Sequence, residues 1–119
     1  MGDILLREDR GAVARLTLNA PQSLNALSDA MLAALQAEFD RLAGDRAIRA
    51  VVLAGNGKAF CAGHDLKEMT RGRQAGDGGA AYFADLFARC SRVMQTIPQM
   101  PQPVIAEVHG IATAAGCQL

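Results

Sequence analysis

The sequence predicts an α/β fold, in which buried strands of one sheet alternate with helices. The first indication is the continuous aliphatic run at residues 48–54, which is typical of a strand covered on both faces. A second such run lies at residues 104–108 and follows a long segment with helical periodicity. The expected order is strand, strand, helix, strand, helix, strand, helix, which is an α/β arrangement.

The amino-terminal part predicts a hairpin followed by a helix. Residues 4–7 and 12–19 have strand character on either side of a turn at Arg10-Gly11. Ser28-Asp29 then offers an N-cap, and Gly44 ends the helix. The apolar positions of this helix recur at helical spacing: Met31, Leu32, Leu35, Phe39 and Leu42.

The second half predicts two more helices, one more strand and the beginning of a last helix. Asp65 can cap a short helix through Met69, and residues 72–79 form a glycine-rich polar link. Residues 80–97 have helical spacing, and we expect Pro98 to prevent the helix from continuing. After the buried strand at 104–108, residues 114–119 begin a helix that is too short to stand alone. We therefore expect the chain to be a fragment.

The composition limits which partners and which cellular location we expect. The 119 residues fit one domain, and twelve acidic side chains balance twelve basic ones, so nothing in the charge favours nucleic acid or a membrane surface. The amino terminus lacks the apolar core of a signal peptide and the acid-poor character of a transit peptide, so we expect a cytoplasmic chain. Cys61, Cys90 and Cys117 are widely spaced, which predicts reduced structural thiols and no metal site.

Two loops share one design. Residues 60–66 and 110–118 each run from a buried strand through small residues to a helix start. Small residues let a ligand approach the main chain, and the first N–H groups of a helix have no internal partner. Two such donors on one carbonyl oxygen would form an oxyanion hole. The alternative is that the small residues only permit tight packing of a helix against a strand.

Several polar residues have simpler interpretations. Asp65 is expected to be a helix cap and not the partner of His64 in a catalytic dyad. His109 is expected to be packed or hydrogen-bonded, and Glu107 needs a partner or an edge position. Glu68 and Lys67 are expected to be surface charges.

Three segments occur together in order: PQSLNAL, FCAGHDLKEM and PVIAEVHGIATAAGCQL. They resemble the crotonase superfamily, the enoyl-CoA hydratase/isomerase family, over essentially the whole chain. The resemblance implies a ClpP/crotonase-like spiral of ββα units. Members of this family are longer, so residues 1–119 would be the amino-terminal part of a crotonase-fold domain, truncated at the start of the active-site helix. The resemblance also implies that the full-length protein is a homotrimer or homohexamer.

The resemblance implies a set of site residues. The N–H groups of His64 and Ala115 would form the oxyanion hole, with the His64 side chain incidental. Coenzyme A would be part of the substrate, with no separate cofactor and no metal. The carbonyls of Ala62, His64 and Leu66 would hold its adenine, and the family's loop would pass the nucleotide and pantetheine at two further positions. The substrate-binding set is therefore Ser23, Leu24, Ala62, His64 and Leu66.

Position 118 bears on the reaction. Gln118 stands where hydratases of this family usually have a glutamate, and a second glutamate would lie beyond Leu119. An amide can hold a water but cannot take its proton. The resemblance therefore implies an acyl-CoA thioester-binding enzyme, an enoyl-CoA hydratase or isomerase. The alternative is a catalytically silent acyl-CoA-binding or assembly protein on the same fold.

Overall fold

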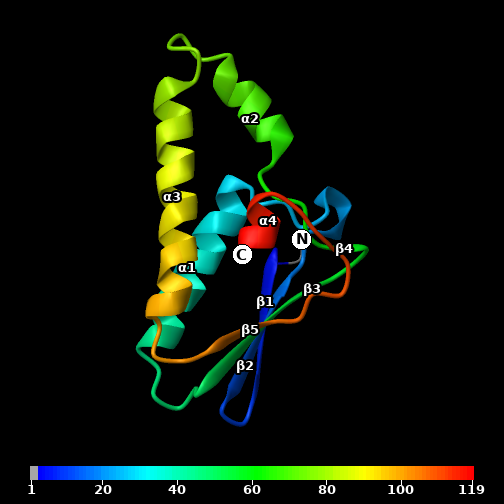
Figure 1. Cartoon of the computed structure of the whole chain (residues 1–119), viewed down its shortest axis with the longest axis vertical. Helices are drawn as coiled ribbons and strands as arrows, with labels where there is room; N and C mark the ends of the chain where they lie inside the picture. The colour runs from blue at the N-terminus through cyan, green and yellow to red at the C-terminus, as the bar shows by residue number, and fades with distance from the viewer. Residues whose placement is uncertain (1–2) are drawn as a thin grey trace.

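The computed structural model describes residues 3–119 and contains a twisted sheet covered by two long helices (Figure 1). The predicted α/β class is confirmed. In chain order the elements are β1 Leu5–Arg10, β2 Val13–Leu18, the 3-10 helix η1 Pro21–Ser23, α1 Asp29–Ala43, β3 Ala50–Gly55, β4 Ala59–Cys61, α2 Leu66–Arg73, α3 Ala80–Gln99, β5 Val104–Ala106, β6 Ile111–Ala112 and α4 Ala115–Gln118.

The main sheet has the order β1-β2-β3-β5. The predicted hairpin forms: β1 and β2 are antiparallel, and Gly11 between them has a left-handed φ of 61°. The pairs β2–β3 and β3–β5 are parallel, which requires crossover connections, and these contain α1 and α3. A second sheet consists of β4 and β6, also parallel. The loops that follow these two short strands form the candidate site.

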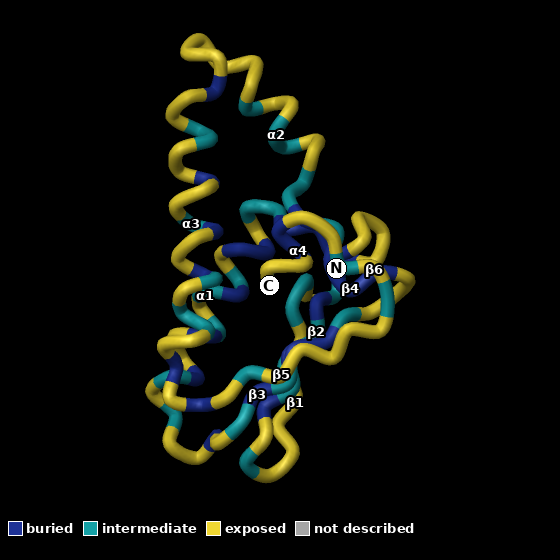
Figure 2. Tube along the Cα trace, viewed as in Figure 1, coloured by how far each residue is buried: buried dark blue, intermediate teal, exposed yellow. Residues whose placement is uncertain are grey.

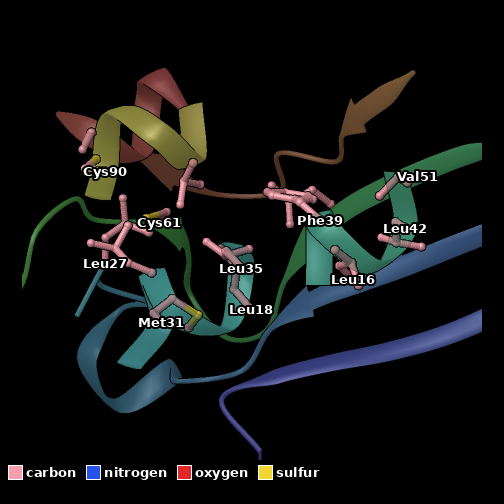
Figure 3. Packing of buried hydrophobic residues seen from close by; sticks show 14 of the residues in the cluster. Leu16, Leu18, Leu27, Met31, Leu35, Phe39, Leu42, Val51, Cys61 and Cys90 are labelled. Atoms are coloured by element: carbon pink, nitrogen blue, oxygen red, sulfur yellow. The ribbon is translucent and has the colours of Figure 1, made fainter. Parts of the chain in front are cut away.

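The core lies between the sheet and α1, with α3 packed alongside (Figures 2 and 3). The inward side chains of β2 are fully buried, as its alternating pattern predicts. Ser28 caps α1 by accepting from the Met31 N–H at 3.1 Å. All five apolar α1 positions predicted from the helical spacing are buried: Met31, Leu32, Leu35, Phe39 and Leu42.

Outside the core, α2 and the first turns of α3 project from the body as a helical hairpin, largely exposed (Figures 1 and 2). Glu68 lies at the base of this hairpin and accepts a hydrogen bond from the Asp29 N–H at 2.8 Å. The expectation that Glu68 is only a surface charge is therefore wrong. Arg89 of α3 bonds the Asp29 carboxylate at 2.7 Å, so the start of α1 is tied to both helices of the hairpin.

Several boundaries differ from the predictions, among them three in the second half of the chain. Helix α2 continues to Arg73, which shortens the glycine-rich link. Helix α3 continues through Pro98 to Gln99, because Pro98 lies in the last turn and the Met100 N–H still bonds back to the Thr96 carbonyl at 3.0 Å. Strand β5 ends at Ala106 and is not a buried strand to residue 108, because it forms the edge of the sheet.

Polar groups near this edge follow the expected rules. Glu107 pairs with Arg15 at 2.6 Å on the exposed side of the sheet, which supplies the partner that its carboxylate needs. The guanidinium of Arg15 holds the pKa of Glu107 below its ordinary value.

Within residues 3–119, no helix is long and apolar enough to span a bilayer.

Candidate functional site

The two small-residue loops meet because their preceding strands are paired. Strands β4 and β6 run parallel, so their carboxyl ends lie at the same edge, and each leads through a short loop to a helix. The Thr113 N–H donates to the Cys61 carbonyl at 3.1 Å, and its hydroxyl donates to the Ala62 carbonyl at 3.2 Å. The starts of α2 and α4 are thus held next to each other.

Gly63 lies at the contact between the loops and has a left-handed φ of 92°. A Cβ on this residue would lie 3.1 Å from the Ala114 Cβ, 3.2 Å from the Thr113 carbonyl oxygen and 3.5 Å from the Ala115 nitrogen. A side chain on Gly116 would overlap the carbonyl of Cys61. Both glycines are therefore required for the close approach of the loops. The packing role of the small residues, which was the simpler interpretation, is real.

The amides of His64 and Ala115 lie on either side of this contact. Among residues 3–119, neither N–H donates a hydrogen bond to another group of the chain. Ala115 is the first residue of α4, whose initial N–H groups have no partner within the helix. The His64 nitrogen follows Gly63 directly, and the Ala115 nitrogen lies 3.5 Å from the Gly63 Cβ position. Two free donors are thus concentrated in one small region.

A third loop, residues 20–27, packs against the first one, and sequence reasoning missed the residue that holds this third loop in place. Asn25 is fully buried; its Nδ2 donates to the Asn56 and Ala59 carbonyls at 2.9 and 3.0 Å, and its Oδ1 accepts from the Ala20 N–H at 2.8 Å. Its left-handed φ of 54° is tolerated by asparagine better than by most residues. The sequence signal was an asparagine between Leu24 and Ala26, within the short run at residues 24–27 that is otherwise apolar.

The same loop brings two of the expected substrate-binding residues, Leu24 and Ala62, into contact. The Leu24 carbonyl accepts from the Ala62 N–H at 3.1 Å, and the Leu27 N–H donates to the Gly63 carbonyl at 2.6 Å. Ser23 is exposed, and its hydroxyl donates to the Ala20 carbonyl at 3.1 Å. Leu24 therefore lies against Ala62, directly before Gly63 and His64.

The three carbonyls expected to hold adenine are not equivalent. The Ala62 carbonyl accepts from the Thr113 hydroxyl, and the Leu66 carbonyl accepts from the Thr70 hydroxyl at 2.8 Å. The His64 carbonyl accepts no hydrogen bond from the residues that the structure describes. Of the three acceptors, His64 is the one left with full capacity for a ligand.

A cavity of about 390 Å³ opens beside these loops. It is lined by residues from the first loop, from α3 and from α4: His64, Phe87, Cys90, Ser91, Met94, Gln95 and Gln118. Figure 3 shows Cys90 of α3 above Cys61 and Leu27, next to α4. Gln118 lies in the same helix as Ala115, so both elements that carry the free amides also line the cavity.

The side chain of His64 lines this cavity, which no sequence pattern predicted. Its ring packs edge-on to Phe87, with ring centroids 5.7 Å apart. Its Nδ1 is buried and has no hydrogen-bond partner among the described residues. Burial lowers the pKa of the imidazole below its ordinary value, since a charged ring would lose its hydration.

Other candidate residues have structural roles. Asp65 caps α2 by accepting from the Lys67 and Glu68 N–H groups at 2.9 and 3.2 Å, which confirms the cap interpretation. His109 is exposed, and its Nε2 lies 2.6 Å from the Gly57 carbonyl oxygen, so it is hydrogen-bonded as expected. Across residues 3–119, no three His, Cys, Asp or Glu side chains gather as a metal site would require.

The three cysteines do not share one environment. All three are free thiols, and Cys61 and Cys90 are buried, as structural thiols would be. Burial raises the pKa of both. Cys117 is exposed on α4, so the expectation of a structural role does not hold for this residue.

Comparison with known proteins gives a consistent result. Residues 8–119 match the family described as enoyl-CoA hydratase/isomerase. The chain is 40% identical over 115 residues to enoyl-CoA hydratase domain-containing protein 3 of Xenopus laevis, covering 97% of this chain and 37% of that protein. It is 42% identical over 117 residues to a probable enoyl-CoA hydratase of Rhizobium meliloti, covering 98% of this chain and 42% of the relative.

Solved structures agree. The crystal structure of an enoyl-CoA hydratase from Mycobacterium smegmatis is 60% identical with a TM-score of 0.89, over 98% of this chain and 44% of the other. Human enoyl-CoA hydratase domain-containing protein 3 is 37% identical with a TM-score of 0.87, over the same shares. The expected crotonase fold is confirmed. The chain spans less than half the length of these relatives.

The relatives also correct the expected location. The proteins of Xenopus laevis and Homo sapiens that match this chain are named as mitochondrial. The expectation of a cytoplasmic chain, which depended on the composition of the amino terminus alone, is therefore wrong.

Proposed function

The chain belongs to the enoyl-CoA hydratase/isomerase family, and from that premise we propose that it binds an acyl-CoA thioester and stabilises the enolate of that thioester. The N–H groups of His64 and Ala115 would donate to the thioester oxygen as negative charge develops on it. Each such donor is worth roughly 2.7–4 kcal/mol in the transition state of comparable oxyanion sites. The reaction would be that of an enoyl-CoA hydratase or isomerase.

One observation carries this proposal: two main-chain amides, which have no hydrogen-bond partner among residues 3–119, flank Gly63, where the loops pack too closely for a side chain. Glycine at this point lets the loop that carries the His64 amide approach the loop that carries the Ala115 amide. A buried N–H without a partner costs free energy, so such pairs persist where a ligand satisfies them. The cavity beside them, lined by Phe87 and Met94, has an apolar part that suits an acyl group.

Coenzyme A would enter as part of the substrate. We assign its adenine to the carbonyl of His64, with Ala62 and Leu66 as weaker acceptors because hydroxyl groups of the chain already use them. Ser23 and Leu24 would contact the nucleotide and pantetheine. For the full-length protein we propose a homotrimer or homohexamer. Exposed Ile105, Val108 and Ile111 provide apolar surface of the kind that interfaces bury.

The test uses acetoacetyl-CoA, whose enolate absorbs in the near ultraviolet. Binding to the purified protein should raise the enolate absorbance at a pH where free acetoacetyl-CoA is mostly in the keto form. Replacing His64 with proline removes one donor, so the absorbance rise should be lost. No rise with the unmodified protein, despite binding of coenzyme A itself, would refute the oxyanion assignment.

A second candidate function is supported by the residue at position 118. Gln118 lines the cavity where the family usually has a carboxylate, and the cavity's seven lining residues include no Asp or Glu. This favours a catalytically silent acyl-CoA-binding protein. Crotonyl-CoA separates the two: loss of its conjugated thioester absorbance indicates hydration. Binding without turnover, also after Gln118→Glu, would support the silent protein.

A further inference from the structure

The cavity beside the free amides contains two titratable side chains, His64 and Cys90, among its seven lining residues. Burial raises the pKa of Cys90, so its thiol stays protonated and is a poor base near neutral pH. The other lining side chains cannot exchange a proton near neutral pH: Phe87, Ser91, Met94, Gln95 and Gln118. The imidazole of His64 is therefore the single group of this lining that can both take and return a proton.

The surroundings favour the neutral form of this imidazole. Its ring packs against Phe87 of α3, and the other residues that line the cavity with it, Cys90, Ser91, Met94, Gln95 and Gln118, carry no charged side chain. The neighbouring carboxylate of Asp65 is engaged in capping α2. Burial is the cause that lowers the pKa of His64, with no charged group contributing. A neutral imidazole is the form that can accept a proton.

The two ring nitrogens differ in access. Nδ1 is buried without a partner, whereas Nε2 makes no hydrogen bond to the described residues and is not among the buried unpartnered atoms. Nε2 is thus the nitrogen that a water in the cavity can reach. Gln118 cannot take a proton from that water, but its side-chain amide can hold and orient it.

We propose that the imidazole of His64, through Nε2, is the acid–base group for addition of water to an enoyl-CoA thioester bound in this cavity. This inference rests on the proposed function. The water oxygen bonds to the β-carbon while Nε2 takes one water proton. The π electrons of the carbon–carbon double bond form a new double bond between the α-carbon and the thioester carbon, and the carbonyl π electrons move to the oxygen, which gives the enolate. The imidazolium then returns the proton to the α-carbon, giving the 3-hydroxyacyl thioester. Atoms and charge balance, and the imidazole ends neutral.

The experiment compares His64→Gln with His109→Gln in the intact protein. Glutamine keeps hydrogen-bonding capacity but cannot titrate, and His109 is the one other histidine of the sequence, outside the cavity. We expect His64→Gln to lower kcat for crotonyl-CoA hydration by about 100-fold or more, the usual size of acid–base catalysis. The His109→Gln protein should turn over normally. Both variants should still raise the enolate absorbance of acetoacetyl-CoA, because the backbone donors remain.

A pH profile adds a readout that a structural role would not change. The kcat/KM of the unmodified protein should fall as pH drops through the lowered pKa of His64, because the protonated ring cannot act as a base. The residual activity of His64→Gln should lack this limb. Free imidazole should restore part of the activity of His64→Ala, since that variant leaves space in the cavity.

The outcomes separate the two proposals. Full hydration activity in His64→Gln, or no turnover by an unmodified protein that binds the enolate, would overturn the role of the imidazole and leave the oxyanion site standing. Absence of enolate binding in the unmodified protein would overturn both. Loss of enolate binding in His64→Gln alone would mean that the side chain acts in binding, which also overturns the acid–base role.

Discussion

Replacing Gly63 with alanine tests whether the contact between the two loops creates the proposed site. The added Cβ would lie 3.1 Å from the Ala114 Cβ and 3.2 Å from the Thr113 carbonyl oxygen, so the second loop must shift by a few tenths of an ångström. The left-handed φ of 92° adds strain of about 1–2 kcal/mol for an L-residue. The shift falls on the residues directly before and at the Ala115 amide.

The expected functional loss exceeds the expected loss of stability. Displacing one oxyanion donor costs about 100- to 1,000-fold in kcat at comparable sites. Crotonyl-CoA hydration measures this loss, the enolate absorbance of acetoacetyl-CoA measures the binding part, and thermal unfolding measures stability. We expect the variant to remain folded with a lower Tm while both functional signals fall by at least an order of magnitude.

Gly11→Ala is the matched control. Gly11 also has a left-handed φ, 61°, but a Cβ there would meet no atom within 4 Å. This variant should lose stability by a comparable strain of about 1–2 kcal/mol and keep its turnover. Equal activity in Gly63→Ala and in the unmodified protein would refute the reasoning. So would equal losses of activity in both variants, because strain alone would then explain the effect.

Three further predictions concern the support of the site. Asn25→Ala leaves two buried backbone groups, the Ala20 N–H and the Ala59 carbonyl, and one partly buried group, the Asn56 carbonyl, without the Asn25 side chain as partner. Each buried group costs about 1–3 kcal/mol, so urea unfolding should show a loss of at least about 2 kcal/mol, and a loss under about 1 kcal/mol would contradict this. Gly116→Ala overlaps the Cys61 carbonyl and should unfold at a much lower temperature than Gly44→Ala, whose Cβ meets one atom at 3.8 Å, and similar melting curves would be evidence against the tight packing. Iodoacetamide should alkylate Cys117 readily in the native protein and Cys61 and Cys90 only after denaturation, because their buried thiols have raised pKa values; mass spectrometry reads the sites, and fast labelling of Cys61 would contradict its burial.

Structural features that depend on residues close together in the sequence were predicted correctly. The hairpin around Gly11, the Ser28 cap with its five buried α1 positions, and the Asp65 cap all formed as expected. Each depends on contacts within a few residues or on the alternation of one strand or helix. Such features follow from backbone geometry and side-chain periodicity.

The misjudged residues depend on partners far away in the chain. Glu68 bonds the start of α1, thirty-nine residues away, and no local pattern marks it. The aliphatic run after Pro103 suggested a buried strand, but burial depends on what covers the sheet, and β5 lies at its edge. The role of Asn25 was missed for the same reason, since one of the carbonyls that its side chain bonds lies thirty-four residues away.

The sequence by itself determined the fold class, the helix caps and the two glycine-containing loops, because propensity, periodicity and turn chemistry act locally. Only the tertiary structure brought Gly63 against Thr113 and Ala114, and only it placed the His64 ring in a cavity with Gln118. The physical reason is that parallel pairing of β4 with β6 joins segments about fifty residues apart, at a distance that no short sequence pattern encodes.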